Sequence, residues 1–88
     1  MEVSFDPAKN ADNIKKHGVS LIEATGFEWD EAVTWPDQRH DYGENRMIGL
    51  GYIGDRLFNV VFVDRGEKYR IISLRKANQR EVKRYAQT

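Results

Sequence analysis

The stretch Leu57–Val63 constrains the fold most, because six of its seven side chains are apolar. A half-exposed strand alternates apolar and polar residues, so a nearly unbroken apolar run predicts a central strand covered on both faces. The Gly54–Asp55 pair just before it is a two-residue hairpin signal that joins it to an earlier strand over Asn45–Ile53. Gly49 and Gly51 in that earlier strand predict a bend or the close approach of a neighbour.

Further strands are expected on both sides of this pair. A turn at Arg65–Glu67 precedes a third strand over Lys68–Leu74. Val33–Trp35 is a weaker candidate, and the proline that follows it limits the strand or places it at a sheet edge. Val3–Phe5 is read either as a short first strand or as an extended arm.

The first helix is expected over Pro7–Lys16. Asp6 can accept hydrogen bonds from the free backbone N–H groups of a helix start, and proline suits the first helical position. Gly18 is a natural left-handed stop. The helix is poor in apolar residues, so we expect it on the surface with one thin inward stripe, formed by Ala8, Ala11 and Ile14.

Two capping-box patterns predict two more helices. Ser20 with Glu23 would open a second helix, and Asn78 with Glu81 a final helix that ends near Gln87. The inward side chains expected are Leu21, Ala24 and Phe27 in the second helix, and Val82, Tyr85 and Ala86 in the last. The expected fold is therefore α+β: two N-terminal helices, an antiparallel β-meander of three to four strands and a C-terminal helix, in a single domain over residues 1–88.

Composition removes several classes of function. The chain has no cysteine, which excludes disulfides, thiolate nucleophiles and zinc–thiolate sites. No signal peptide and no apolar run of membrane-spanning length are visible, so we expect a cytoplasmic protein without membrane contact. Although the formal net charge is zero, residues 65–84 hold eight basic and two acidic side chains. Such asymmetry favours contact between the C-terminal third and a polyanion, or simply a basic face in solvent.

The order and spacing of several short segments resemble the BrnT family of toxins over almost the whole chain. The segments that carry the resemblance are Asp6–Lys9, Asn13, Lys16–Ser20, Glu23–Ala24, Tyr42–Arg46, Gly49, Arg65–Gly66, Arg70–Arg75, Ala77, Glu81 and Tyr85.

The resemblance implies a RelE-like fold and an endoribonuclease toxin of a type II toxin–antitoxin system. It also implies RNA as the substrate and a BrnA-like antitoxin with a ribbon-helix-helix region as the partner. Promoter DNA would be contacted only through the toxin–antitoxin complex.

RNA cleavage can proceed without metal or cofactor, and we expect neither here. The 2′-hydroxyl is the nucleophile, so the enzyme must take its proton, stabilise the charge on phosphorus and protonate the leaving oxygen. Arginine suits the phosphate, and histidine suits proton transfer. The candidate catalytic residues are Arg65, Arg70, Arg75 and His17. Arg70 and Arg75 are an odd number of residues apart, so a regular strand would point their side chains to opposite faces. Both can serve one site only if a bulge intervenes or Arg75 lies past the strand end.

A second group of residues is expected to bind rather than react. Lys16, Arg46 and Tyr85 are candidates for RNA contact, whereas Trp29 and Trp35 flank an acidic segment and are candidates for holding the antitoxin. Glu44 is read as a general base or as the ion-pair partner of Arg46, and His40 has no motif around it.

Structural alternatives exist for each candidate: the arginines can form ordinary surface ion pairs, His17 can cap a helix, and the aromatic residues can belong to the core. At the level of function, the alternative is a non-catalytic module that binds nucleic acid or an acidic protein, or a folded but degenerate toxin.

Overall fold

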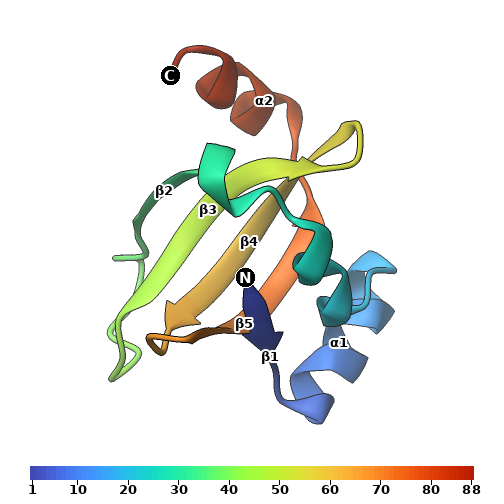
Figure 1. Ribbon diagram of the computed structural model, residues 1–88, viewed down its shortest axis with the longest axis vertical. Coiled ribbons are helices and arrows are strands. Elements are labelled where there is room, and N and C mark those ends of the chain that lie inside the picture. Colours follow the sequence, from blue (N-terminus) through green and yellow to red (C-terminus); the bar gives the residue numbers. More distant parts are fainter.

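The apolar run predicted to be central is the middle strand of a five-stranded sheet. The computed structural model describes all 88 residues, and its sheet has the order β1-β5-β4-β3-β2 (Figure 1). The strands are β1 (Glu2–Ser4), β2 (Val33–Pro36), β3 (Arg46–Ile53), β4 (Arg56–Asp64) and β5 (Lys68–Lys76). Every residue of Leu57–Val63 is buried, which confirms that β4 is covered on both faces. β2 is an edge strand, as its proline indicated.

The expectation of an antiparallel meander of three to four strands, as in a RelE-like fold, is only partly correct. β2 to β5 do form an antiparallel meander, but β1 adds a fifth strand that runs parallel to β5. Its three residues pair with Lys68–Arg70. A strand this short carries no alternation pattern, so its pairing depends on the free edge of β5 and not on a local signal.

The main core lies between one face of the sheet and the segment that follows the first helix. Leu21, Ala24 and Phe27 are buried there, as predicted, against β4 and β5. A Cβ atom on Gly51 would lie 2.5 Å from the ring of Phe27, so the glycine is needed for this close approach. This confirms the expected role of Gly51.

The second helix is a short 3-10 helix, η1 (Leu21–Gly26), and the capping box predicted at its start is absent. The hydroxyl of Ser20 instead donates to Oδ1 of Asn10 at 3.3 Å, and the N–H of Leu21 donates to the same oxygen at 2.7 Å. Asn10 from the preceding helix therefore replaces the local cap. A second 3-10 turn, η2 (Trp29–Glu31), follows.

The first helix, α1 (Pro7–His17), begins after Asp6 and ends at the left-handed Gly18, as predicted. Its expected inward stripe is wrong: Ala8, Ala11 and Ile14 are exposed, and Asn13 is buried instead. The Asn13 side chain donates to the carbonyl of Leu74 at 2.7 Å and accepts from its N–H at 3.1 Å. The helix thus covers a strand edge, where backbone groups require a polar partner and not an apolar one.

The last helix, α2 (Gln79–Ala86), opens with the predicted capping box of Asn78 and Glu81. The expected sheet-facing side chains are only partly correct, because Val82 is 46% exposed and Ala86 is exposed. Tyr85 is the one that packs inward, edge-on to Tyr52. Figure 1 shows why: α2 stands at one end of the sheet and does not lie across it.

Candidate active site

Three arginine side chains surround the carboxylate of Glu44. Nε of Arg46 lies 3.0 Å from Oε2, whereas Nη2 of Arg65 and Nη2 of Arg70 lie 3.7 Å and 3.6 Å from Oε1. We call Glu44, Arg46, Arg65 and Arg70 the Glu44 cluster. It unites two of the predicted catalytic residues, Arg65 and Arg70, with the predicted RNA contact Arg46.

The strand register explains how distant parts of the chain meet in this cluster. Arg46 on β3 and Arg70 on β5 both pair with Val63 on β4, so the two side chains share one face of the sheet. Arg65 follows directly in the turn between β4 and β5, where Gly66 adopts a φ of 88°. The three arginines therefore gather at one end of the sheet.

The charges of the cluster do not balance, because three guanidinium groups face one carboxylate. The hydrogen bond from Arg46 lowers the pKa of Glu44; desolvation opposes this shift, and the charges of Arg70, Arg46 and Arg65 add to it. Nε of Arg70 is buried and has no hydrogen-bond partner. An unmet buried donor next to surplus positive charge is an environment that favours an anion.

The loop over residues 37–45 carries Glu44 and is anchored at its start. The side chain of Asp37, which is buried, accepts two hydrogen bonds of 2.8 Å from the guanidinium of Arg39. The Asp37 N–H also donates to the carbonyl of Arg46 at 2.7 Å. The hydrogen bond from Arg39 is the main reason that the pKa of Asp37 falls to about 2.

A hollow of about 650 Å³ opens between this loop and the start of β3, and Glu44 and Arg46 are in its wall. His40 and Tyr42 line it as well. The guanidinium carbon of Arg46 lies 4.1 Å from the centre of the Tyr42 ring, and the His40 ring stands edge-on to that ring at 5.6 Å. The hollow thus combines a carboxylate, an imidazole, an aromatic ring and a cation.

His40 was not predicted to belong to the site, because no motif surrounds it. His40, Tyr42, Glu44 and Arg46 occupy alternate positions along the chain. The backbone between them is not extended, because it bends at residues 39–40 and 43–44 and Gly43 has a φ of 69°. Their shared hollow therefore depends on the path of the folded loop, and the alternate spacing alone does not indicate it.

Arg75 is not part of the Glu44 cluster. The pairing of β4 with β5 shifts by a bulge between Val61 and Phe62, as a shared face for Arg70 and Arg75 required. Arg75 pairs with Asn59 and therefore lies on the same face of the sheet as Arg70. Its guanidinium, however, donates to both oxygens of Glu81 at 2.8 Å and 2.9 Å. Arg75 therefore ties α2 to the sheet.

His17 and Lys16 also lie apart from the cluster. They end α1 and line a separate shallow hollow of about 170 Å³ beside Ile72 and Ser73. Both side chains are exposed. The structure therefore does not bring the four predicted catalytic residues into one site.

The predicted aromatic contacts are largely occupied within the chain. Tyr85 donates its hydroxyl to the carbonyl of Glu31 at 3.2 Å. Trp29 donates its indole N–H to the carbonyl of Ala24 at 3.1 Å and packs against the core. The Trp35 ring on β2 is covered by the guanidinium of Arg84, 3.8 Å from its centre.

No three side chains among His, Cys, Asp and Glu are grouped closely enough to hold a metal ion. None of the helices has the length and apolar character needed to cross a membrane.

A comparison of the sequence with protein families places the chain in a known group. Residues 5–81 match the family model described as the ribonuclease toxin BrnT of type II toxin–antitoxin systems. This chain belongs to the BrnT family. The match spans all four residues of the Glu44 cluster and the loop that carries His40. Membership implies ribonuclease activity and an antitoxin partner, as the resemblance indicated. No curated protein matches the sequence.

Proposed function

We propose that the chain is an endoribonuclease toxin whose Glu44 cluster holds the scissile phosphodiester and works without a metal ion. The observation that carries this proposal is the contact of three guanidinium groups with one carboxylate, at 3.0 Å, 3.6 Å and 3.7 Å. The surplus positive charge favours a phosphate, and the carboxylate provides a proton acceptor next to it.

In the proposed reaction the 2′-oxygen attacks phosphorus while Glu44 accepts the hydroxyl proton. The P–O5′ bond breaks, and His40 donates a proton to the leaving oxygen. The products are a 2′,3′-cyclic phosphate and a 5′-hydroxyl, so no water or other co-reactant is consumed in this step. Arg65 and Arg70 stabilise the charge that develops on the phosphoryl oxygens.

Substrate binding would also adjust Glu44 for this role. In the free protein the arginines lower its pKa, which keeps it ionised but makes it a weak base. A bound phosphate neutralises part of their charge and brings another negative charge near the carboxylate, so the pKa of Glu44 rises towards its ordinary value. Tyr42 lies where it could stack on a base, as aromatic residues do in many RNA-binding sites.

The test is cleavage of RNA by the purified chain in excess EDTA, compared with Arg65→Ala and Arg70→Ala. We expect cleavage without added metal and a loss of at least about 100-fold in each variant, because each removes a charge that acts on the transition state. Arg56→Ala is a matched control, since Arg56 is exposed at the opposite end of β4.

Two outcomes would contradict this proposal. A strict requirement for Mg²⁺ would remove the metal-independent mechanism. Salt-sensitive RNA binding without any turnover would favour the non-catalytic binding module.

The antitoxin is proposed to be BrnA-like, with a ribbon-helix-helix region that carries all contact with promoter DNA. This rests on family membership, since the family is one of type II toxins. A gel-shift assay should show no binding of promoter DNA by the toxin alone and binding by the complex.

A further inference from the structure

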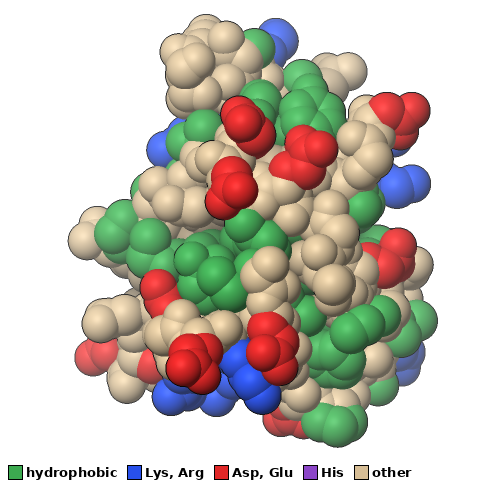
Figure 2. Space-filling model, in the orientation of Figure 1, with side chains coloured by type: hydrophobic (Ala, Val, Ile, Leu, Met, Phe, Trp, Pro, Cys, Tyr) green, Lys and Arg blue, Asp and Glu red, His purple; other side chains and the backbone are tan.

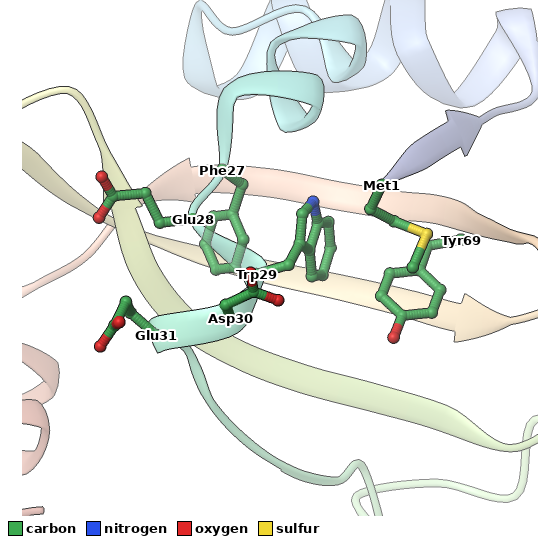
Figure 3. Close-up of a pocket in the computed structure, with 7 residues that line it drawn as sticks. All are labelled: Met1, Phe27, Glu28, Trp29, Asp30, Glu31 and Tyr69. Atoms are coloured by element: carbon green, nitrogen blue, oxygen red, sulfur yellow. The ribbon is translucent and has the colours of Figure 1, made fainter.

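An apolar groove lies on the face of the sheet opposite the Glu44 cluster. Two neighbouring hollows of about 500 Å³ and 460 Å³ share Trp29 and Tyr69 in their walls. The other apolar side chains that line them are Met1, Phe27, Ala32, Met47 and Phe62. We call these seven residues the aromatic groove, and Figure 3 shows Phe27, Trp29 and Tyr69 side by side in its first hollow.

The groove and the arginines of the proposed RNA site are formed by alternate side chains of the same two strands. Met47 directly follows Arg46 on β3, and Tyr69 directly precedes Arg70 on β5. Successive side chains on a strand point to opposite faces, so the groove and the cluster lie on opposite sides of the same end of the sheet. A molecule seated on Trp29 and Tyr69 therefore leaves the three arginines uncovered, although Asn45 and Met47 line both the second hollow of the groove and the hollow beside Glu44.

The floor of the groove is already ordered. The Trp29 ring lies 4.6 Å from Phe27, 5.0 Å from Phe62 and 4.8 Å from Tyr69, measured between ring centres, and its N–H is hydrogen-bonded. A partner would find a preformed aromatic surface, and the entropy cost of ordering it is small.

The charged side chains that line the groove are all acidic. Glu28, Asp30 and Glu31 border the first hollow and Asp64 borders the second, and neither is lined by any lysine or arginine. None of the four carboxylates forms an ion pair within the chain. Figure 2 shows acidic side chains around the apolar patch on this face, with a basic group between two of them below the patch. Such a rim repels RNA and favours a basic protein segment.

We propose that the aromatic groove seats a segment of the antitoxin in which apolar side chains are flanked by lysine or arginine. The proposal rests on the proposed function, since it requires a toxin with an antitoxin partner. The apolar side chains of the segment pack on Trp29 and Tyr69, while its basic side chains pair with the free carboxylates on the rim. The antitoxin is thus anchored on the face of the sheet opposite Arg46 and Arg70.

The test measures binding of the antitoxin by calorimetry, with the purified product of the reading frame next to this chain's gene as the probe. The groove variant is Asp30→Lys with Glu31→Lys, whose side chains are exposed and without partners in the chain. The control variant is Asp12→Lys with Asp55→Lys, which changes the net charge equally at exposed positions outside the groove.

We expect the groove variant to raise the Kd at least about tenfold and to cleave RNA at the normal rate. The control variant and Arg70→Ala should bind the antitoxin with unchanged affinity. Thermal unfolding checks that each variant is folded, and Asp30→Asn with Glu31→Gln is the milder substitute if the reversal unfolds the chain.

Four results would overturn the proposal. The first is unchanged antitoxin affinity in the groove variant, and the second is a loss of affinity in Arg70→Ala, which would place the antitoxin on the Glu44 cluster. The third is no binding of the probe by the unsubstituted chain. The fourth is a dimer of the chain alone that Asp30→Lys with Glu31→Lys dissociates, which would assign the groove to a second copy. Failure of the proposed function is seen separately, as absence of RNA cleavage by the unsubstituted chain.

Discussion

Replacing Glu44 by glutamine should change RNA binding and RNA cleavage in opposite directions. The substitution keeps the shape of the side chain but removes the only negative charge among three guanidinium groups that lie within 3.7 Å of it. A proton acceptor is lost, while the cations that bind phosphate remain.

The size of the binding effect follows from Coulomb's law. A phosphate on the outer side of Arg65 and Arg70 would lie roughly 6 Å from the carboxylate, where two unit charges repel by about 0.7 kcal/mol in water and about 3 kcal/mol at an effective dielectric constant of 20. The Glu44 side chain is 22% exposed, which lies between these limits. We therefore expect Glu44→Gln to bind RNA about tenfold more tightly.

The effect on cleavage is larger and of opposite sign. Loss of a general base typically costs about 100-fold to 10,000-fold in rate. Single-turnover cleavage of a short RNA gives the rate, and fluorescence anisotropy with its 2′-O-methyl analogue, which cannot react, gives the affinity. Glu67→Gln is the control, because Glu67 is an exposed carboxylate in the neighbouring turn.

Cleavage by Glu44→Gln within about threefold of normal would refute a base at this position. Weaker RNA binding by the same variant would refute the electrostatic argument, since it would mean that the carboxylate mainly orients the arginines.

Three further predictions concern the frame that supports the site. Asn13→Ala should lower the free energy of unfolding, measured in urea, by about 2–4 kcal/mol, because it leaves the buried N–H and carbonyl of Leu74 unpaired. A loss under about 1 kcal/mol would contradict the view that Asn13 satisfies the backbone groups at the edge of β5. Gly51→Ala should cost about 1–3 kcal/mol by the same measurement, because its methyl group meets the Phe27 ring at 2.5 Å, and full stability would show that the ring can move aside at no cost. The pKa of Asp37 lies at about 2 in the folded chain against an ordinary 3.8, so its bond to Arg39 stabilises fully above pH 4 and is lost as the pH falls towards 2. The Arg39 side chain is 62% exposed, so screening by solvent reduces this contribution to about 1 kcal/mol. In Asp37→Asn, the free energy of unfolding measured in urea should therefore change less between pH 2 and pH 4 than it does in the unsubstituted chain.

Short-range chemistry made much of this fold predictable. The helix start at Asp6, the stop at Gly18 and the capping box at Asn78 each depend on a few neighbouring residues, and all three are confirmed. The central strand over Leu57–Val63 was predictable for the same reason, since its own side chains determine that it is covered on both faces.

What the sequence did not predict depends on residues far apart in the chain. Asn13 turns inward because the edge of β5, 61 residues later, has backbone groups to satisfy. The parallel pairing of β1 likewise needs that edge and has no local pattern.

The site was predictable only in part, for a similar reason. Arg65 and Arg70 were identified as candidates, but their partner Glu44 is brought to them by a loop whose start is bonded to β3 through the Asp37 N–H and the Arg46 carbonyl. Arg75 was a candidate because a guanidinium group suits a phosphate, but Glu81, an acceptor six residues later, holds it elsewhere.

The most direct test of the Glu44 cluster as the phosphate site is to observe its guanidinium groups while RNA binds. Nuclear magnetic resonance of the arginine Nε–H groups can follow a titration with a 2′-O-methyl oligonucleotide. If the cluster binds the phosphate, the largest shifts occur at Arg46, Arg65 and Arg70, and the signals of Arg56 and Arg75 remain nearly unchanged. Shifts confined to Arg75, or to the amides around Lys16 and His17, would contradict it.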